Sequence, residues 1–194
     1  MKYFLGNLHE IYKFDYFSYN VTFRNGLRKK DDEKYTINIE TESEPVITQN
    51  YDAPFSLHFT DGTILKMQKN KNGFKIDNNG TATLFAFFSP WCPPCQVQSP
   101  ILNNIQENFK GKLQVIGVLV GENLTNDDAK VFAQDNNVTY KISQGNQNDF
   151  FAKTLGGVSE VPFIVIYDEK GKFFSQYFGV IPEEILTTEI QRIF

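Results

Sequence analysis

Two cysteines stand two residues apart in the segment 91–95 (WCPPC), and their place in the chain constrains its fold more than any other feature. The segment follows an apolar run at 83–88 (TLFAFF), which has no polar alternation and predicts a strand buried on both faces. Residues 93–109 show apolar side chains every four positions and predict a helix, kinked by Pro100 and ended by Gly111. The cysteines therefore lie where a buried strand meets the start of a helix.

That position favours redox chemistry at sulfur. A sulfur in the first turn of a helix faces unpaired backbone N–H groups and the positive end of the helix dipole, and both stabilise the thiolate. Cys92 is nearer that end and next to a loop, so we predict that it is the attacking thiol. Cys95 comes one helical turn later, close enough for the two sulfurs to bond, and is the predicted resolving thiol.

From Thr81 the chain alternates long apolar runs with helical patterns, which is typical of βαβ units around a buried sheet. The helix at 93–109 is expected to bury the side chains that recur every four residues, namely Val97, Ile101, Ile105 and Phe109. The remaining elements are predicted as a strand at 113–120, a helix from the cap Thr125 to about Asn136, a short helix at 149–155, strands at 163–167 and 173–178 joined by the turn 168–171, and a helix from Pro182. The predicted order is βαβαββα with an extra short helix before the third strand, which is an α/β fold.

The first part of the chain differs in texture. Residues 7–79 are polar and strand-like, with alternation at 35–40 and 55–59, and predict irregular β structure. Residues 66–80 are rich in Asn, Lys and Gly and predict a loop that carries a short hairpin. We therefore predict an N-terminal β-rich extension at 1–50, which either shields the sheet or recruits a partner, followed by a domain at 51–194.

Composition and charge exclude several classes of protein. The 194 residues are 41% hydrophobic and 22% charged, which is typical of a soluble globular protein. The net charge is −4 and no basic stripe is present, so nucleic-acid binding is not expected. No apolar run reaches the ~18 residues of a membrane span, and residues 1–20 lack the pattern of a signal peptide. Aromatic residues make up 15%, which predicts either an aromatic core or an apolar docking face.

The cysteine pair also limits metal binding. Zinc would need two further ligands, and His9 and His58 are isolated in the sequence, so no metal site is predicted from them. Two soft thiolates are enough for Cu(I), so a copper-binding or metal-delivery module is the alternative to a redox role. No organic cofactor is expected beside the redox-active disulfide between Cys92 and Cys95.

A proline before a strand is the second candidate site element. Val161-Pro162 precedes the predicted strand at 163–167. If the Val161-Pro162 bond is cis, it would hold the preceding backbone open for an extended partner segment beside the sulfurs. The alternative is an ordinary trans proline that begins a strand. Trp91, next to Cys92, is expected to be exposed in the apolar patch that receives partner disulfides.

These features together resemble a known superfamily. The segment 85–95 (FAFFSPWCPPC), Pro100, and Val161-Pro162 before a strand and the turn 168–171 resemble thioredoxin-fold proteins, most of all the TlpA/ResA-type thiol:disulfide oxidoreductases. The resemblance covers about 53–194 and implies a thioredoxin-like fold with a central mixed β-sheet flanked by helices. Residues 1–50 do not share it.

The resemblance also implies an activity and a setting. It implies disulfide exchange with protein thiols and disulfides in the reducing direction, supplied by an upstream thiol electron donor. It implies a docking surface shaped by Trp91, Pro93, Pro94, Val161 and Pro162. It places the protein in the bacterial cell envelope or periplasm, where some relatives serve cytochrome c maturation, with the cytoplasm as the alternative. The motif alone leaves the reduction potential open, within roughly −270 to −120 mV.

Two positions depart from the pattern of the relatives. Ala86 stands where thioredoxins carry a buried acid, and Gln98 stands where ResA-type proteins carry a glutamate. A neutral amide cannot take the proton of Cys95, so that role falls to water, the leaving thiolate or Glu160, whose alternative is a solvated loop residue. If this step limits turnover, Gln98→Glu is expected to raise the rate. Ser89 replaces the threonine that peroxiredoxins carry three residues before their attacking cysteine, so peroxidase activity is not expected.

Overall fold

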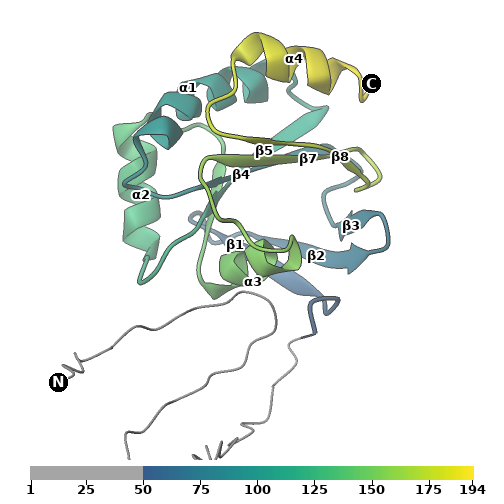
Figure 1. The fold of residues 1–194 in the computed structure, drawn as a ribbon, viewed down its shortest axis with the longest axis horizontal. Coiled ribbons are helices and arrows are strands. Elements are labelled where there is room, and N and C mark those ends of the chain that lie inside the picture. The colour runs from purple at the N-terminus through teal and green to yellow at the C-terminus, as the bar shows by residue number, and fades with distance from the viewer. Residues whose placement is uncertain (1–49) are drawn as a thin grey trace, which may run out of the picture. The chain divides into compact units, whose positions relative to one another are not determined.

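The computed structural model describes residues 50–194 (Figure 1). Within this part the chain forms one sheet of eight strands in the order β3-β2-β1-β6-β5-β4-β7-β8. The predicted strand at 35–40 and the β-rich extension lie outside the described residues. The division into 1–50 and 51–194 stays a prediction.

The sheet is mixed. Strands β4, β5 and β6 pair in parallel, whereas β7 and β8 on one side and β1, β2 and β3 on the other pair antiparallel. The strands are β1 (Phe55–Phe59), β2 (Ile64–Asn70), β3 (Gly73–Ile76), β4 (Ala82–Phe88), β5 (Leu113–Leu119), β6 (Lys141–Gln144), β7 (Phe163–Tyr167) and β8 (Phe173–Phe178). This arrangement, with helices packed on it, confirms the predicted thioredoxin-like α/β fold of this part of the chain.

Helices cover both faces of the sheet. They are α1 (Pro93–Asn108), α2 (Asn126–Asp135), α3 (Asn146–Thr154) and α4 (Glu183–Gln191). Leu84 and Ala86 of β4 belong to the apolar cluster that α1, α2 and α4 cover, whereas the alternate residues Phe85 and Phe87 belong to the cluster that α3 covers. In Figure 1, α1 and α4 lie on the side of the sheet opposite to α3. All seven residues of β4 are buried, as the unbroken apolar run predicts.

Much of the aromatic content lies in the core under α3. The ring of Phe151 has its centroid 4.9–5.6 Å from the rings of Phe55, Phe74, Phe85 and Phe87. Phe151 is fully buried at 0% exposure. The composition left open whether the aromatic residues form a core or a docking face. The rings around Phe151 form a core.

Most predicted elements are present, and the number of strands needs correction. Strands β7 and β8 have the predicted bounds, and Thr125 caps α2 in a capping box with Asp128. Strand β6 was missed, because its sequence KISQ is short and three of its four residues are polar, so the order from β4 is βαβαβαββα. The short hairpin predicted within the loop at 66–80 is present, as β2 and β3 pair from Met67–Ile76 to Asn70–Gly73.

The predicted buried face of α1 is confirmed at Ile105 and Phe109, is partly right at Ile101, and is wrong at Val97. Val97 is 58% exposed, and the buried residues are Cys95, Gln98, Ser99, Leu102 and Ile105. A step of four residues turns about 40° past a full helical turn, so a strict spacing of four drifts off any one face. The true core face combines steps of three and four, and two of its members are polar.

The two edge strands of the sheet meet at one end. Gly73 of β3 forms an isolated bridge with Lys172, and the Phe74 N–H donates to the Gly171 carbonyl over 2.8 Å. A Cβ atom at Gly171 would overlap the carbonyl oxygen of Phe74, and Gly171 has φ +72°, so this close approach requires glycine. The sheet therefore curls until its edges touch.

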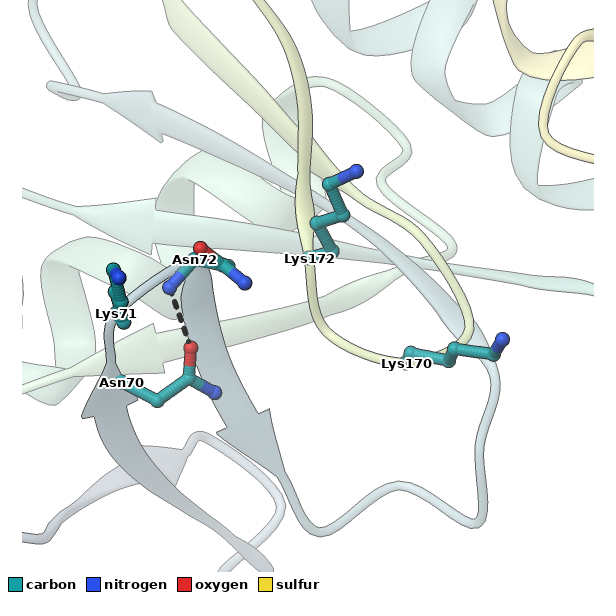
Figure 2. A pocket seen from close by; sticks show the side chains of 5 residues that line it. All are labelled: Asn70, Lys71, Asn72, Lys170 and Lys172. Atoms are coloured by element: carbon teal, nitrogen blue, oxygen red, sulfur yellow. Dashed lines mark hydrogen bonds between the residues drawn. The ribbon is translucent and has the colours of Figure 1, made fainter.

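A shallow hollow of about 450 Å³ lies at this end, between the turn that joins β2 to β3 and the turn that joins β7 to β8 (Figure 2). It is lined by Asn70, Lys71, Asn72, Lys170 and Lys172. Tyr167, just before the second turn, pairs with Thr83 at the start of β4, whereas the cysteines follow the end of β4. The hollow therefore lies at the end of the sheet away from the cysteines.

Candidate functional site: the Cys92–Cys95 disulfide

The start of α1 holds the first cysteine. Cys92 is the N-cap residue with an extended backbone, and its Sγ accepts the backbone N–H of Cys95 over 3.1 Å. Pro93 and Pro94 fill the first two helical positions, where the N–H that proline lacks would have no partner within the helix. The local sequence therefore sets a sulfur at the helix terminus, where hydrogen bonding and the helix dipole favour negative charge.

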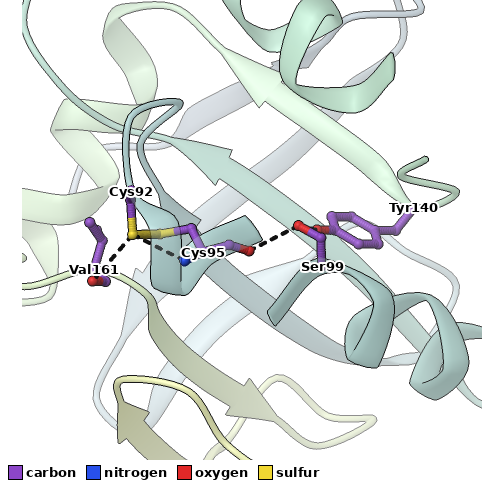
Figure 3. Close-up of a disulfide and its surroundings, with 5 residues drawn as sticks. All are labelled: Cys92, Cys95, Ser99, Tyr140 and Val161. Atoms are coloured by element: carbon purple, nitrogen blue, oxygen red, sulfur yellow. Dashed lines mark hydrogen bonds between the residues drawn. A yellow bond between two sulfur atoms is a disulfide. The ribbon is translucent and has the colours of Figure 1, made fainter. Parts of the chain in front are cut away.

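Cys92 and Cys95 are joined by a disulfide, with their Cα atoms 5.2 Å apart (Figure 3). Cys95 is buried at 2% exposure inside the cluster under α1, whereas Cys92 is partly exposed. An incoming reactant can therefore reach Cys92 more easily than Cys95.

The Val161-Pro162 loop lies against the disulfide. The Val161-Pro162 peptide bond is cis, which confirms the first of the two readings of this proline. The carbonyl oxygen of Val161 is 3.6 Å from Cys92 Sγ, a close contact while that sulfur carries no hydrogen (Figure 3). Pro162 is buried, and its carbonyl accepts the N–H of Gly179 over 2.9 Å. Two loops far apart in sequence thus meet beside the sulfurs.

Three polar residues behind Cys95 were not recognised together from the sequence. Ser99 Oγ donates to the Cys95 carbonyl over 3.0 Å, and the Tyr140 hydroxyl donates to Ser99 Oγ over 3.4 Å (Figure 3). Burial raises the pKa of Tyr140 to about 12, so it stays protonated at neutral pH. Gln98 is buried at 1% exposure and bonds the backbone of Ile181. The sequence carries no signal of this last contact, since the two residues are 83 positions apart.

The acid proposed for proton transfer makes no hydrogen bond or ion pair to the cysteines among the described residues. Glu160 is exposed, and the hydrogen bonds and ion pairs of residues 50–194 include none that joins its side chain to the site. Ala86 is buried at 3% exposure and leaves no acid at its position. His58 is exposed on β1, and His9 lies outside the described residues. Within 50–194 no group of three or more His, Cys, Asp and Glu side chains is placed to hold a metal ion.

Exposed apolar side chains lie next to Cys92 in the sequence and on the segment 178–180, whose Gly179 bonds Pro162; together we call them the apolar rim. We use this name for Trp91, Pro93, Pro94, Phe178 and Val180. Trp91 is 64% exposed next to Cys92, and the two prolines are exposed as well. Phe178 is 50% exposed and stacks on Phe163, the residue after Pro162, with ring centroids 4.7 Å apart. Val180 follows Gly179, which bonds Pro162. Large exposed apolar side chains gathered near a reactive group are typical of a protein docking surface.

None of the helices in the described part of the chain has the length and apolar character needed to cross a membrane.

Comparisons with known proteins agree with this geometry. The thioredoxin of Pyropia yezoensis is 31% identical over 51 residues, which are 26% of this chain and 48% of that protein, so the match spans about half of its length. The thioredoxin-like protein YneN of Bacillus subtilis is 25% identical over 149 residues, covering 74% of this chain and 79% of that protein.

Solved structures add the likeness of fold. StoA from Bacillus subtilis superposes with a TM-score of 0.56 at 20% identity, over 71% of this chain and 96% of that one. The sequence profile of the Redoxin family matches residues 58–190, which include both cysteines and Val161-Pro162. The chain therefore belongs to the redoxin family, within the thioredoxin superfamily.

Proposed function

We propose that this protein is a thiol:disulfide oxidoreductase that exchanges disulfides with protein substrates through Cys92 and Cys95, in the reducing direction. One observation carries the proposal. The partly exposed Cys92 accepts the N–H of Cys95 at a helix start and is bonded to a buried Cys95, which is the arrangement that separates an attacking from a resolving sulfur.

The reaction follows from this arrangement in two exchanges. In the reduced protein the Cys92 thiolate attacks one sulfur of a substrate disulfide; that S–S bond breaks, and the leaving sulfur takes up a proton. Cys95, after losing its proton, attacks Cys92 Sγ and breaks the mixed disulfide, and the second substrate sulfur leaves and is protonated. Two electrons pass to the substrate, and the disulfide Cys92–Cys95 is formed. An upstream thiol donor must then reduce it again.

The substrate would dock on the apolar rim. An extended substrate segment can pair with the backbone before Pro162, because Val161 lies directly against Cys92 Sγ. Trp91, Pro93 and Pro94 would contact it from the side of α1, and Phe178 and Val180 from the other side. Apolar contacts of this kind suit a protein that must accept several partners.

The proton of Cys95 needs an acceptor during the second exchange. Gln98 cannot serve, since an amide is not a base at neutral pH. We assign the role of proton acceptor to water or to the leaving thiolate. The alternative acceptor is the carboxylate of Glu160, which a loop movement would have to bring in. No organic cofactor or resident metal enters this scheme.

We further propose that the protein works in the bacterial cell envelope. The support is its resemblance to TlpA/ResA-type proteins and its likeness of fold to a secreted disulfide oxidoreductase of Mycobacterium tuberculosis, with a TM-score of 0.54. Reduction of the cysteines of apocytochrome c belongs to this proposal as one class of substrate.

A disulfide reduction assay tests the activity. Insulin with dithiothreitol as donor should be reduced faster with the wild type than with Cys92→Ala, and Cys95→Ala should not sustain turnover. The same assay with Cu(I) present separates the alternative role. Absence of turnover together with binding of one Cu(I) per chain would overturn the proposal in favour of metal delivery.

A further inference from the structure

Both polar atoms of the buried Gln98 amide bond to one residue of a distant loop. Its Oε1 accepts the Ile181 N–H over 2.7 Å, and its Nε2 donates to the Ile181 carbonyl over 3.3 Å. Gln98 is 1% exposed and lies one helical turn beyond Cys95 in α1. A buried amide with both ends satisfied fixes the distance and the orientation of the backbone that it bonds.

The bonded loop leads back to the disulfide. Ile181 follows Gly179 and Val180, and the Gly179 N–H donates to the Pro162 carbonyl over 2.9 Å. Val161, the residue before that proline, touches Cys92 Sγ at 3.6 Å. The contacts thus connect α1 to the segment 179–181, this segment to the Val161-Pro162 loop, and the loop to Cys92 at the start of α1. Gln98 is the residue of α1 that makes the first of these connections.

We propose that Gln98 is a positioning residue, which holds the segment 179–181 and through it the Val161-Pro162 loop in register with Cys92, so that a protein disulfide docks in line with the attacking sulfur. This inference rests on the proposed function and assigns part of its substrate recognition. It gives Gln98 a role other than the proton transfer considered for this position. Val180, 40% exposed between the two bonded residues, is the part of the apolar rim that Gln98 places most directly.

The chemistry of the amide makes the role testable by pH. An amide offers both a donor group and an acceptor group, as does a protonated carboxylic acid, whereas a carboxylate only accepts. In Gln98→Glu the ionised side chain would keep the bond from the Ile181 N–H and would face the Ile181 carbonyl without a donor. Burial and that carbonyl raise the pKa of such a carboxyl group. Lowering the pH would therefore restore both hydrogen bonds.

The kinetic experiment compares three variants with the wild type between pH 5 and pH 8. Gln98→Met keeps the size and removes both bonds, Gln98→Glu keeps them only when protonated, and Gln96→Glu is the control, because Gln96 is exposed on the same helix. The readouts are KM and kcat for insulin, and the rate with a small aromatic disulfide that needs no docking surface. Each variant is expressed as a ratio to the wild type at the same pH, which cancels the titration of Cys92.

We expect Gln98→Met to raise KM for insulin roughly tenfold at every pH, the size of one or two lost hydrogen bonds, with the small-disulfide rate unchanged. Gln98→Glu should match the wild type near pH 5 and Gln98→Met near pH 8, and Gln96→Glu should match the wild type throughout. The inference would be overturned if the KM of Gln98→Met for insulin equalled that of the wild type. It would also be overturned if the ratio of the Gln98→Glu KM to the wild-type KM were the same at pH 5 and pH 8. A faster Gln98→Glu enzyme at pH 8 would also overturn it, and would instead support the expectation from the sequence that a carboxylate at position 98 takes the proton of Cys95.

A second measurement does not depend on activity. Amide hydrogen exchange at Ile181 should be slow in the wild type and faster in Gln98→Met. In Gln98→Glu the protection factor of Ile181, which corrects for the intrinsic pH dependence of exchange, should be higher at pH 5 than at pH 8. Equal protection of Ile181 in all three proteins would overturn the inference. If the wild type reduces no protein disulfide, the proposed function fails, while Ile181 exchange still tests the Gln98 contact.

Discussion

The backbone N–H of Cys95 donates a hydrogen bond to the Sγ of Cys92 over 3.1 Å. Once the disulfide is reduced, a bond of this kind favours the charged form of the sulfur that accepts it. Cys95 has its own side chain in the apolar cluster under α1, where burial disfavours a thiolate. The same pair of residues therefore differs both in access and in the stability of the thiolate.

The first prediction concerns the order of alkylation. Reduced protein treated with iodoacetamide near neutral pH should be labelled at Cys92 first, because Cys92 is partly exposed and Cys95 is 2% exposed. Peptide mass spectrometry at several times gives the two rates, and unfolded protein in urea is the control, in which the rates should converge. Faster labelling of Cys95 in the folded protein would reverse the assigned roles.

The second prediction concerns trapped intermediates. Cys95→Ala should accumulate mixed disulfides with insulin or with partner proteins, because Cys92 still attacks and no second thiol resolves the product. Cys92→Ala should accumulate few, because its remaining thiol is buried. Non-reducing electrophoresis measures both, and equal amounts of adduct from the two variants would exclude a directional mechanism.

The third prediction concerns the apolar rim. Trp91→Ala should raise KM for insulin about tenfold, the usual effect of losing an aromatic anchor, and leave the rate with a small disulfide unchanged. Phe194→Ala is the matched control: Phe194 is also an exposed aromatic, 46% exposed, and its ring stacks on Phe109 beyond the far end of α1. Equal effects of both variants on KM would remove Trp91 from the docking surface.

The fourth prediction concerns the closure of the sheet. Gly171 and Gly62 both have positive φ, +72° and +82°, but only Gly171 has a backbone oxygen, that of Phe74, where a Cβ would lie. Gly62→Ala should lower the free energy of unfolding by ~1 kcal/mol through strain alone. Gly171→Ala should lower it by ~3 kcal/mol or more, because the edge strands must separate. Urea unfolding measures both, and equal losses would show that the edge contact adds nothing.

The fifth prediction concerns stability in alkali. Burial raises the pKa of Tyr140 from 10.0 to about 12. The contribution of the protonated Tyr140 to the free energy of unfolding is therefore complete below pH 10 and is lost as the pH rises to about 12. In that window the unfolded chain releases this proton before the folded one does, and two pKa units correspond to ~3 kcal/mol.

Tyr140→Phe measures this contribution. It should be less stable than the wild type at pH 8 by ~1 kcal/mol, through loss of the bond to Ser99. Its stability should then fall less steeply from pH 10 to pH 12. Parallel stability curves for the two proteins would show that Tyr140 does not titrate in this way. Tyr167, whose pKa burial also raises, remains in both proteins, so part of the alkaline loss persists.

Much of the fold could be predicted because the signals are local. The unbroken apolar run of β4, the cap Thr125 and the turn before Gly171 each specify an element through sterics or hydrogen bonds a few residues apart. β6 was missed because its four residues show no pattern of their own, and they become a strand by pairing with β5 on one side and β1 on the other. Long-range pairing overrides weak local preference.

The same distinction holds for the candidate site. The sequence by itself determined the cysteine pair at the start of a helix after a buried strand, because motif and helix capping are contiguous. Val161-Pro162 was expected beside the sulfurs from the sequence and its resemblance, but only the tertiary structure decided that Gly179 bonds Pro162 and that Gln98 holds Ile181. These contacts join residues 17 to 83 positions apart, and no local preference encodes which buried polar atoms will meet when the sheet and its helices pack.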